Sequence, residues 1–271
     1  MTRFAHAVRE ELWSRGRRLE SRLAHGQAVE EEDGSITAID VRDHGLVAKA
    51  EAELERLRQS VPEHALVRLV AEASTERVSA TMTVRIGATS VVTDPEHVLE
   101  DVALLRSARV APAARALTRS TPILWRNGSG AVLLHELIGH PLEHDHAIVE
   151  LPSWLRAEIP LRMRRATFRD VPLLRMEHVR VRQTDAPFDL RGERIEVSLV
   201  DSGAYEALTG NVTIRVAAST VGAFEIVEPR SSFVFLGASG QARRYPGVIC
   251  SREGQELVVG SYAPDILTGF R

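Results

Sequence analysis

The segment from His135 to His140 limits what this chain can fold into more than any other, because it places two histidines on a run that favours a helix. The segment reads HELIGH and follows the apolar residues 131–134. In the familiar zinc protease motif the histidines are four residues apart, which sets them about 40° from each other on one face of a helix. Here they are five residues apart. A regular helix would separate them by roughly 140° and would not bring both to one ion.

The residues around the second histidine can relieve this mismatch. Gly139 weakens the helix, and Pro141 disfavours helical geometry at the residue before it. We therefore expect His135 on regular helix and His140 on a widened or terminating turn.

The histidines and the single cysteine, Cys250, have the chemistry of a metal site. Two imidazoles and a thiolate give zinc three protein ligands and leave a fourth position open for water, as in catalytic zinc sites. Glu136, next to the first histidine, could take a proton from that water, and the combination is typical of a hydrolase. The alternatives are a chance occurrence of the hexapeptide and, for the cysteine, a buried thiol that packs as a small hydrophobe.

Side chains that follow the second histidine could support such a site. Metal-bound histidines usually need a partner for their second nitrogen, and Glu143 and Asp145 are the nearest carboxylates. His144 or His146 could stabilise the oxyanion of a transition state. The alternative for all four is a solvated polar turn.

Two separate segments resemble one known family. Residues 133–145 read LLHELIGHPLEHD, and residues 247–264 read GVICSREGQELVVGSYAP. They are similar to the patterns LLHExxGHxLExD and GxxCxxxGQxxxVGxxxP of the TldD/PmbA metallopeptidases, also called modulators of DNA gyrase. The resemblance implies that His135, His140 and Cys250 bind Zn²⁺ and that Glu136 activates water. Family members are usually longer, so the chain is expected to be a compact member.

The resemblance also implies an activity and partners. The expected activity is zinc-dependent hydrolysis of peptide or amide bonds in a small or unstructured peptide, or in a peptide-like biosynthetic intermediate. The family's paired assembly implies a homodimer or a heterodimer with a homologous subunit. The alternative is a non-catalytic partner subunit that scaffolds an active homologue, although the intact ligands and glutamate argue against it. A structural zinc site is a third possibility, but such sites usually have four protein ligands.

Composition excludes several classes of function. The chain has 271 residues, 44% of them hydrophobic, with a net charge of −3. An estimated pI near 6.4 gives no global attraction to nucleic acid or to an anionic membrane. The first residues lack the apolar core of a signal peptide, and no stretch approaches the roughly 18 apolar residues of a membrane span. We expect a cytoplasmic protein that binds neither nucleic acid nor membrane.

The N-terminal part predicts helices and strands in alternation, with a domain boundary in the Pro/Ala-rich passage at residues 111–120. The expected domains are residues 1–118, an N-terminal α/β region, and residues 119–271, a zinc-binding domain. The expected elements are an amphipathic helix at residues 3–24, a helix at 46–60, a strand at 65–71, one or two strands at 78–92 with a break near Gly87, and a helix from Asp94 to Arg106.

The C-terminal part is mostly β in pattern. Strands are expected at residues 122–125 and 176–181, and apolar alternation with regularly spaced glycines predicts an antiparallel array from Glu193 onward. Cys250 would enter from a loop at the end of that array. The predicted fold class is α+β, in which a helix and strand region precedes a zinc-binding helix packed on a largely antiparallel β array.

Overall fold

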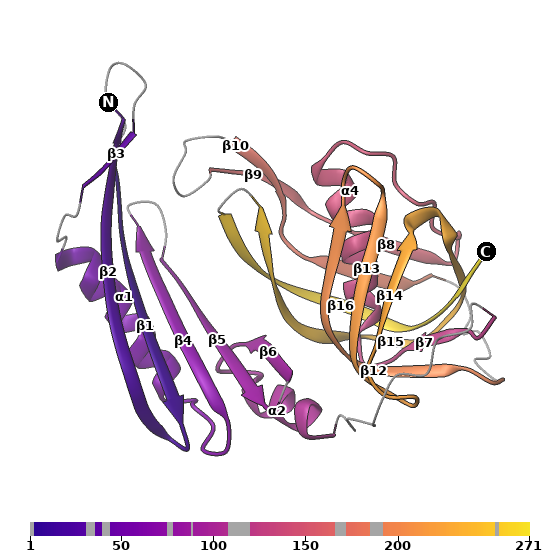
Figure 1. The fold of residues 1–271 in the computed structure, drawn as a ribbon, viewed down its shortest axis with the longest axis horizontal. Coiled ribbons are helices and arrows are strands. Elements are labelled where there is room, and N and C mark those ends of the chain that lie inside the picture. The colour runs from indigo at the N-terminus through magenta and orange to yellow at the C-terminus, as the bar shows by residue number, and fades with distance from the viewer. Residues whose placement is uncertain are drawn as a thin grey trace. The chain divides into compact units, whose positions relative to one another are not determined.

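The computed structural model describes residues 3–30, 36–39, 44–74, 78–87, 89–107, 120–165, 172–184, 192–252 and 255–271. The fold is α+β, as predicted (Figure 1). The described residues form two compact units, one up to Ala103 and one from Leu104 onward. The predicted boundary between residues 118 and 119 lies outside the described residues and stays a prediction.

The first unit is an antiparallel sheet with a helix against it. The strand order is β3-β2-β1-β4-β5-β6, and each neighbouring pair is antiparallel. Helix α1 contacts β1, β4 and β5, and it buries Leu46, Ala50, Leu54 and Leu57. The elements are β1 (Arg3–Ser14), β2 (Arg17–Glu30), β3 (Ile36–Ile39), α1 (His44–Arg58), β4 (Leu66–Ser74), β5 (Val78–Ile86) and β6 (Thr89–Thr93). Helix α2 (Val98–Ser107) begins in this unit and continues past Ala103.

Most predictions for this unit are confirmed. The structure contains the helix expected at residues 46–60 and the strand expected at 65–71, and it has two strands where one or two were expected at 78–92. The helix expected after Asp94 is α2, and the Asp94 carboxylate accepts the backbone N–H of Glu96 and of His97 just before it begins.

The predicted helix at residues 3–24 is wrong, because these residues form the hairpin of β1 and β2. The apolar residues Phe4, Val8 and Leu12 are spaced by four, a spacing that satisfies both the helical period and the strand period of two. The turn at Arg15 and Gly16 favours the strand pair over a continuous helix. Arg15 and Gly16 have φ of 51° and 69°, the two positive values that a two-residue hairpin turn requires.

The second unit is built on a mostly antiparallel sheet. Its strand order is β14-β13-β12-β7-β16-β15, with β11 also paired to β16 and β8 to β11. The β7–β12 and β11–β16 pairs are parallel, and β9 and β10 form a separate antiparallel pair. The strands are β7 (Ile123–Trp125), β8 (Leu155–Glu158), β9 (Leu161–Arg165), β10 (Pro172–Met176), β11 (Val179–Gln183), β12 (Ile195–Glu206), β13 (Asn211–Ser219), β14 (Phe224–Pro229), β15 (Phe233–Arg252) and β16 (Gln255–Phe270).

A helical segment in three parts packs on this sheet. It runs without a break through α3 (Gly130–Leu134), the π-helix η1 (His135–Gly139) and α4 (His140–Glu143). Residues 130–139 are all buried. At Gly130 a Cβ would lie 2.9 Å from the side chain of Ile266 on β16, so glycine allows the close approach of helix and sheet.

Two local predictions for this unit need correction. The strand expected at residues 176–181 is divided, because β10 ends at Met176 and β11 begins at Val179 with different partners. Cys250 lies within β15, paired with Leu257, and not in a loop. Strand β15 carries three register shifts against β16, which interrupt the alternation of two that marks a strand in sequence.

Among the described residues, none of the helices combines the length and the apolar character needed to cross a bilayer.

Candidate metal centre

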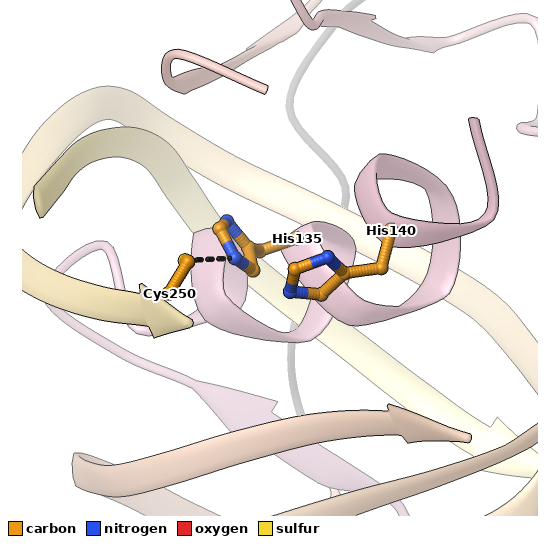
Figure 2. A group of neighbouring side chains, drawn as sticks. All are labelled: His135, His140 and Cys250. Carbon is orange, nitrogen blue, oxygen red and sulfur yellow. Dashed lines mark hydrogen bonds between the residues drawn. The ribbon is translucent and has the colours of Figure 1, made fainter. Parts of the chain in front are cut away.

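The structure brings His135, His140 and Cys250 together in the second unit (Figure 2). Their candidate ligand atoms all lie within 4.8 Å of one another. The Sγ of Cys250 lies 2.9 Å from Nε2 of His135. The two imidazole rings are edge to face, with centroids 4.7 Å apart. Side chains from a helix and from a strand 115 residues away in sequence thus form one buried group.

A π-turn is what lets two histidines five residues apart converge. The backbone N–H of His140 donates to the carbonyl of His135, which is the i to i+5 bond that defines a π-helix. The prediction of a widened turn is confirmed. The widening, however, begins at His135 itself, and the chain continues after His140 as α4 and does not terminate there.

Gly139 has a second role in this helix beyond its flexibility. A Cβ at this position would collide with the thioether of Met176 on β10. Glycine therefore allows β10 to pack directly against the π-turn. As a result, Arg175 and the backbone N–H of Met176 on β10 can donate hydrogen bonds to Glu143 of the helix.

Glu143 orients the second histidine. Its Oε2 lies 2.8 Å from Nδ1 of His140, and its Oε1 accepts the backbone N–H of Met176 at 2.7 Å. Because Nδ1 is engaged, Nε2 of His140 is left to face Glu136 at 3.7 Å. Carboxylate support of this kind fixes the ring and the tautomer of a ligating histidine. His135 lacks it, since its Nδ1 is buried and has no hydrogen-bond partner among the described residues.

The carboxylate of Glu136 lies between the two histidines. Its oxygens are 4.0 Å from Nε2 of His135 and 3.7 Å from Nε2 of His140. It is buried, and its Oε2 has no hydrogen-bond partner within the part of the chain that the structure describes. Behind it stands Gly203 on β12, where a Cβ would lie 2.6 Å from Oε1. The bare backbone of a glycine is what leaves room for this carboxylate.

Burial controls the charges at the centre. It raises the pKa of Glu136 to about 7, helped by the negative charge of Glu143 and opposed by His140. Burial, with the positive charges of His140 and Arg175, lowers the pKa of His135 well below its usual value, so this imidazole is neutral. Burial and the charge of Glu136 raise the pKa of the Cys250 thiol. A divalent cation would reverse this last effect, because a metal-bound thiol is deprotonated.

His140 and Glu143 form the charged pair of the site. Burial would lower the pKa of His140, but its bond to Glu143 and the charges of Glu136 and Glu143 raise it overall. Burial would raise the pKa of Glu143, but its bonds to His140 and to the Met176 amide lower it overall. Both groups therefore favour their charged forms.

The donor set fits zinc. Two imidazole nitrogens and one sulfur are ligands that Zn²⁺ prefers, and three protein ligands leave the open position of a catalytic site. Glu136 lies within 4.0 Å of both imidazoles, and its Oε2 has no hydrogen-bond partner among the described residues. Asp94, Glu96 and His97 form a second group of ligand-type side chains, but they lie at the start of α2, where Asp94 caps the helix.

The other predicted side chains lie just beyond the helix. Nδ1 of His146 is 2.7 Å from the hydroxyl of Tyr205, and the ring of His144 stacks on that of His146 with centroids 5.6 Å apart. Asp145 is exposed and has a φ of 55°. Of the two carboxylates considered for histidine support, the structure places Glu143 at His140.

Sequence reasoning missed three residues that shape the centre. Arg175 is buried and donates to Glu143 and to the carbonyl of Cys250. Gly203, one of the regularly spaced glycines of the β-rich region, lies within β12. Tyr205, two residues further along the same strand, holds His146. None of the three carries a local signal, because each acts through a contact with a distant part of the chain.

Comparisons with known proteins give only structural matches. No family model matches the chain, and no curated protein matches it. TldE from Thermococcus kodakarensis is similar with 9% identity and a TM-score of 0.46, over 100% of this chain and 96% of that one. A candidate modulator of a DNA gyrase from Thermotoga maritima is similar with 9% identity and a TM-score of 0.38, over 99% and 94%. Similarity at this level says nothing about activity.

Proposed function

We propose that this protein is a zinc-dependent hydrolase of peptide or amide bonds. One observation carries the proposal: a buried carboxylate, Glu136, lies within 4.0 Å of the nitrogens of two histidines, one of which contacts a cysteine sulfur. A structural metal site has no use for such a carboxylate. A general base needs to be close to the water that it activates.

The chain's own residues have distinct roles in this proposal. His135, His140 and Cys250 would hold the metal, which supplies Lewis acidity when bound and lowers the pKa of a water. Glu136 accepts a proton from water and passes it to the leaving amine. Its pKa, raised to about 7 by burial, suits both steps near neutral pH. Glu143 keeps the ring of His140 in one orientation throughout.

His146 is the candidate for stabilising the oxyanion. Gly203 and Tyr205 are two apart in a regular part of β12, so both face the side on which Glu136 lies. Tyr205 holds the ring of His146 on this side. An imidazole held by a neighbouring hydroxyl group is the kind of positioned donor that stabilisation of a developing negative charge requires.

The burial of the site favours an extended substrate. The side chains of His135 and Glu136 are 1% and 4% exposed, whereas that of His140 is 17% exposed. Access from the side of His140 suits a small or unstructured peptide, or a peptide-like biosynthetic intermediate, better than a folded protein. The motif resemblance supports the same substrate class and pairing with an identical or homologous subunit. The cytoplasmic location expected from the sequence is part of the same proposal.

The test compares metal content and hydrolysis in the wild type and in Glu136→Gln, with unstructured peptides as substrates. Glu150→Gln, an exposed glutamate before β8, is the matched control. The proposal expects one zinc per chain in all three proteins, with turnover lost only in Glu136→Gln. Zinc without turnover in the wild type would instead favour the non-catalytic partner subunit. A wild type that binds no zinc would overturn both.

A further inference from the structure

Arg175 is wholly buried beside the metal centre. It lies on β10 with 0% of its surface exposed. A guanidinium cannot be neutralised in a protein, and a buried charge is costly unless it is paired and hydrogen-bonded. The hydrogen bonds of the Arg175 guanidinium therefore indicate the role of this residue.

The guanidinium bridges the two elements that carry the candidate ligands. Its Nη1 donates to Oε2 of Glu143 at 3.2 Å, and its Nη2 donates to the backbone carbonyl of Cys250 at 3.0 Å. The same Oε2 of Glu143 is bonded to Nδ1 of His140. A continuous chain of contacts thus runs from one candidate ligand on the helix, through Glu143 and Arg175, to another on β15.

The neighbouring residue reinforces this bridge. The backbone N–H of Met176 donates to the other oxygen of Glu143 at 2.7 Å. Two consecutive residues of β10 therefore hold both oxygens of one carboxylate, and Glu143 has little freedom to rotate. Nη2 of Arg175 binds the backbone carbonyl of Cys250, so Arg175 fixes the position of β15 as well as that of the Glu143 side chain.

We propose that Arg175 is a positioning residue that sets the distance between the cysteine strand and the histidine helix, so that sulfur and imidazoles bind one metal ion. The inference rests on the metal-binding part of the proposed function. This role depends on the planar guanidinium, which offers donors in fixed directions. Arginine offers rigid donors in two directions, whereas a lysine ammonium supplies a point charge on a flexible stem.

Two substitutions separate the hydrogen-bond geometry of Arg175 from its charge. Arg175→Lys keeps a buried positive charge but cannot hold both partners in the same way, and Arg175→Met removes charge and donors together. Arg164→Lys on β9 is the control, because Arg164 lies on the strand paired with β10 and donates to Glu177, outside the centre.

The experiment loads each protein with Co²⁺ or Zn²⁺ in the absence of substrate. Zinc affinity is measured by competition with a chelator. Sulfur coordination is measured from the thiolate-to-cobalt charge-transfer absorption and from X-ray absorption. We expect both Arg175 variants to bind zinc about 10- to 100-fold more weakly, the range found when outer contacts of a metal site are lost. We also expect them to lose sulfur from the coordination shell while keeping nitrogen.

A merely structural role for Arg175 predicts a different result. Unfolding of the metal-free protein would shift, but the ratio of sulfur to nitrogen ligands would stay that of the wild type. Wild-type zinc affinity and wild-type sulfur coordination in Arg175→Lys would overturn the inference, and this variant decides the matter if Arg175→Met does not fold. Failure of the hydrolase part of the proposed function is distinguishable, because it appears as a wild type that binds metal through Cys250 but hydrolyses nothing.

Discussion

Gly203→Ala should disable Glu136 without replacing a candidate metal ligand. A Cβ at this position would lie 2.6 Å from Oε1, 2.7 Å from Cγ and 2.9 Å from Cδ of the glutamate. Ordinary contacts of a Cβ begin at 3.4 Å, so the carboxylate must move by 0.8 Å or more, which is the difference between 3.4 and 2.6 Å. A buried side chain held between two histidines cannot make this shift and keep its position.

The size of the effect follows from the displacement. Misplacing a catalytic group by about 1 Å can cost about a hundredfold in rate, which corresponds to about 3 kcal/mol. We therefore expect kcat to fall about a hundredfold on peptide substrates. Zinc affinity should stay within about twofold of the wild type, because the three atoms nearest to the new methyl group all belong to Glu136 and not to a candidate ligand.

Two further variants test this prediction, one as a control and one as a compensating change. Gly260→Ala on β16 is the control, because a Cβ there meets nothing within 4 Å. Glu136→Asp shortens the side chain by one methylene group and so makes room for the new methyl group. In the Gly203→Ala background it should therefore lower kcat much less than it does alone. Full activity of Gly203→Ala, or strictly additive losses in the double variant, would refute the reasoning.

Two other predictions concern stability and the oxyanion. Glu11→Gln should lower the free energy of unfolding at pH 7 by about 3 kcal/mol, because the pKa of Glu11 is lowered from 4.5 to about 2 and each pKa unit corresponds to about 1.4 kcal/mol. Although burial opposes the shift, bonds from Arg58, Trp13 and Arg18 outweigh it. Since the folded-state pKa is the lower one, this stabilisation is present above pH 4.5 and is lost as the pH falls towards 2. Urea unfolding of both proteins from pH 7 to 2 measures it, and a difference that did not shrink with acid would contradict it. His146→Ala should lower kcat about a hundredfold with unchanged zinc affinity. Steady-state kinetics equal to the wild type would exclude that role for His146.

The ligand cluster was accessible to sequence analysis because its constraints are local. The spacing of His135 and His140, with a glycine and a proline beside them, required a widened turn, and the structure has a π-turn there. Cys250 stood out as the single cysteine. Its position within β15 was not predictable, because register shifts in that strand break the alternation from which strands are recognised.

Contacts that depend on tertiary structure have no comparable local signal in the sequence. Gly203 looks like other glycines of the β-rich region, and only the packing of β12 against the helix shows that a side chain there would strike Glu136. Residues 3–24 were assigned to the wrong element because a spacing of four fits two periods, and the positive φ angles at the turn cannot be read from a pattern of apolar residues.

Buried charge hides two further residues from sequence reasoning, one in each unit. Sequence reasoning places charged residues at the surface, a rule that holds unless the charges are paired. On β1, Glu11 is fully buried and accepts from Arg58, so the face of the strand that turns inward reads as polar. On β10, Arg175 is fully buried and donates to Glu143, in a span where exposed arginines are common. Breaking one member of such a pair leaves an uncompensated buried charge, at a cost of about 3–5 kcal/mol. The residues that pattern analysis assigns to solvent are therefore among those on which the fold and the candidate site most depend.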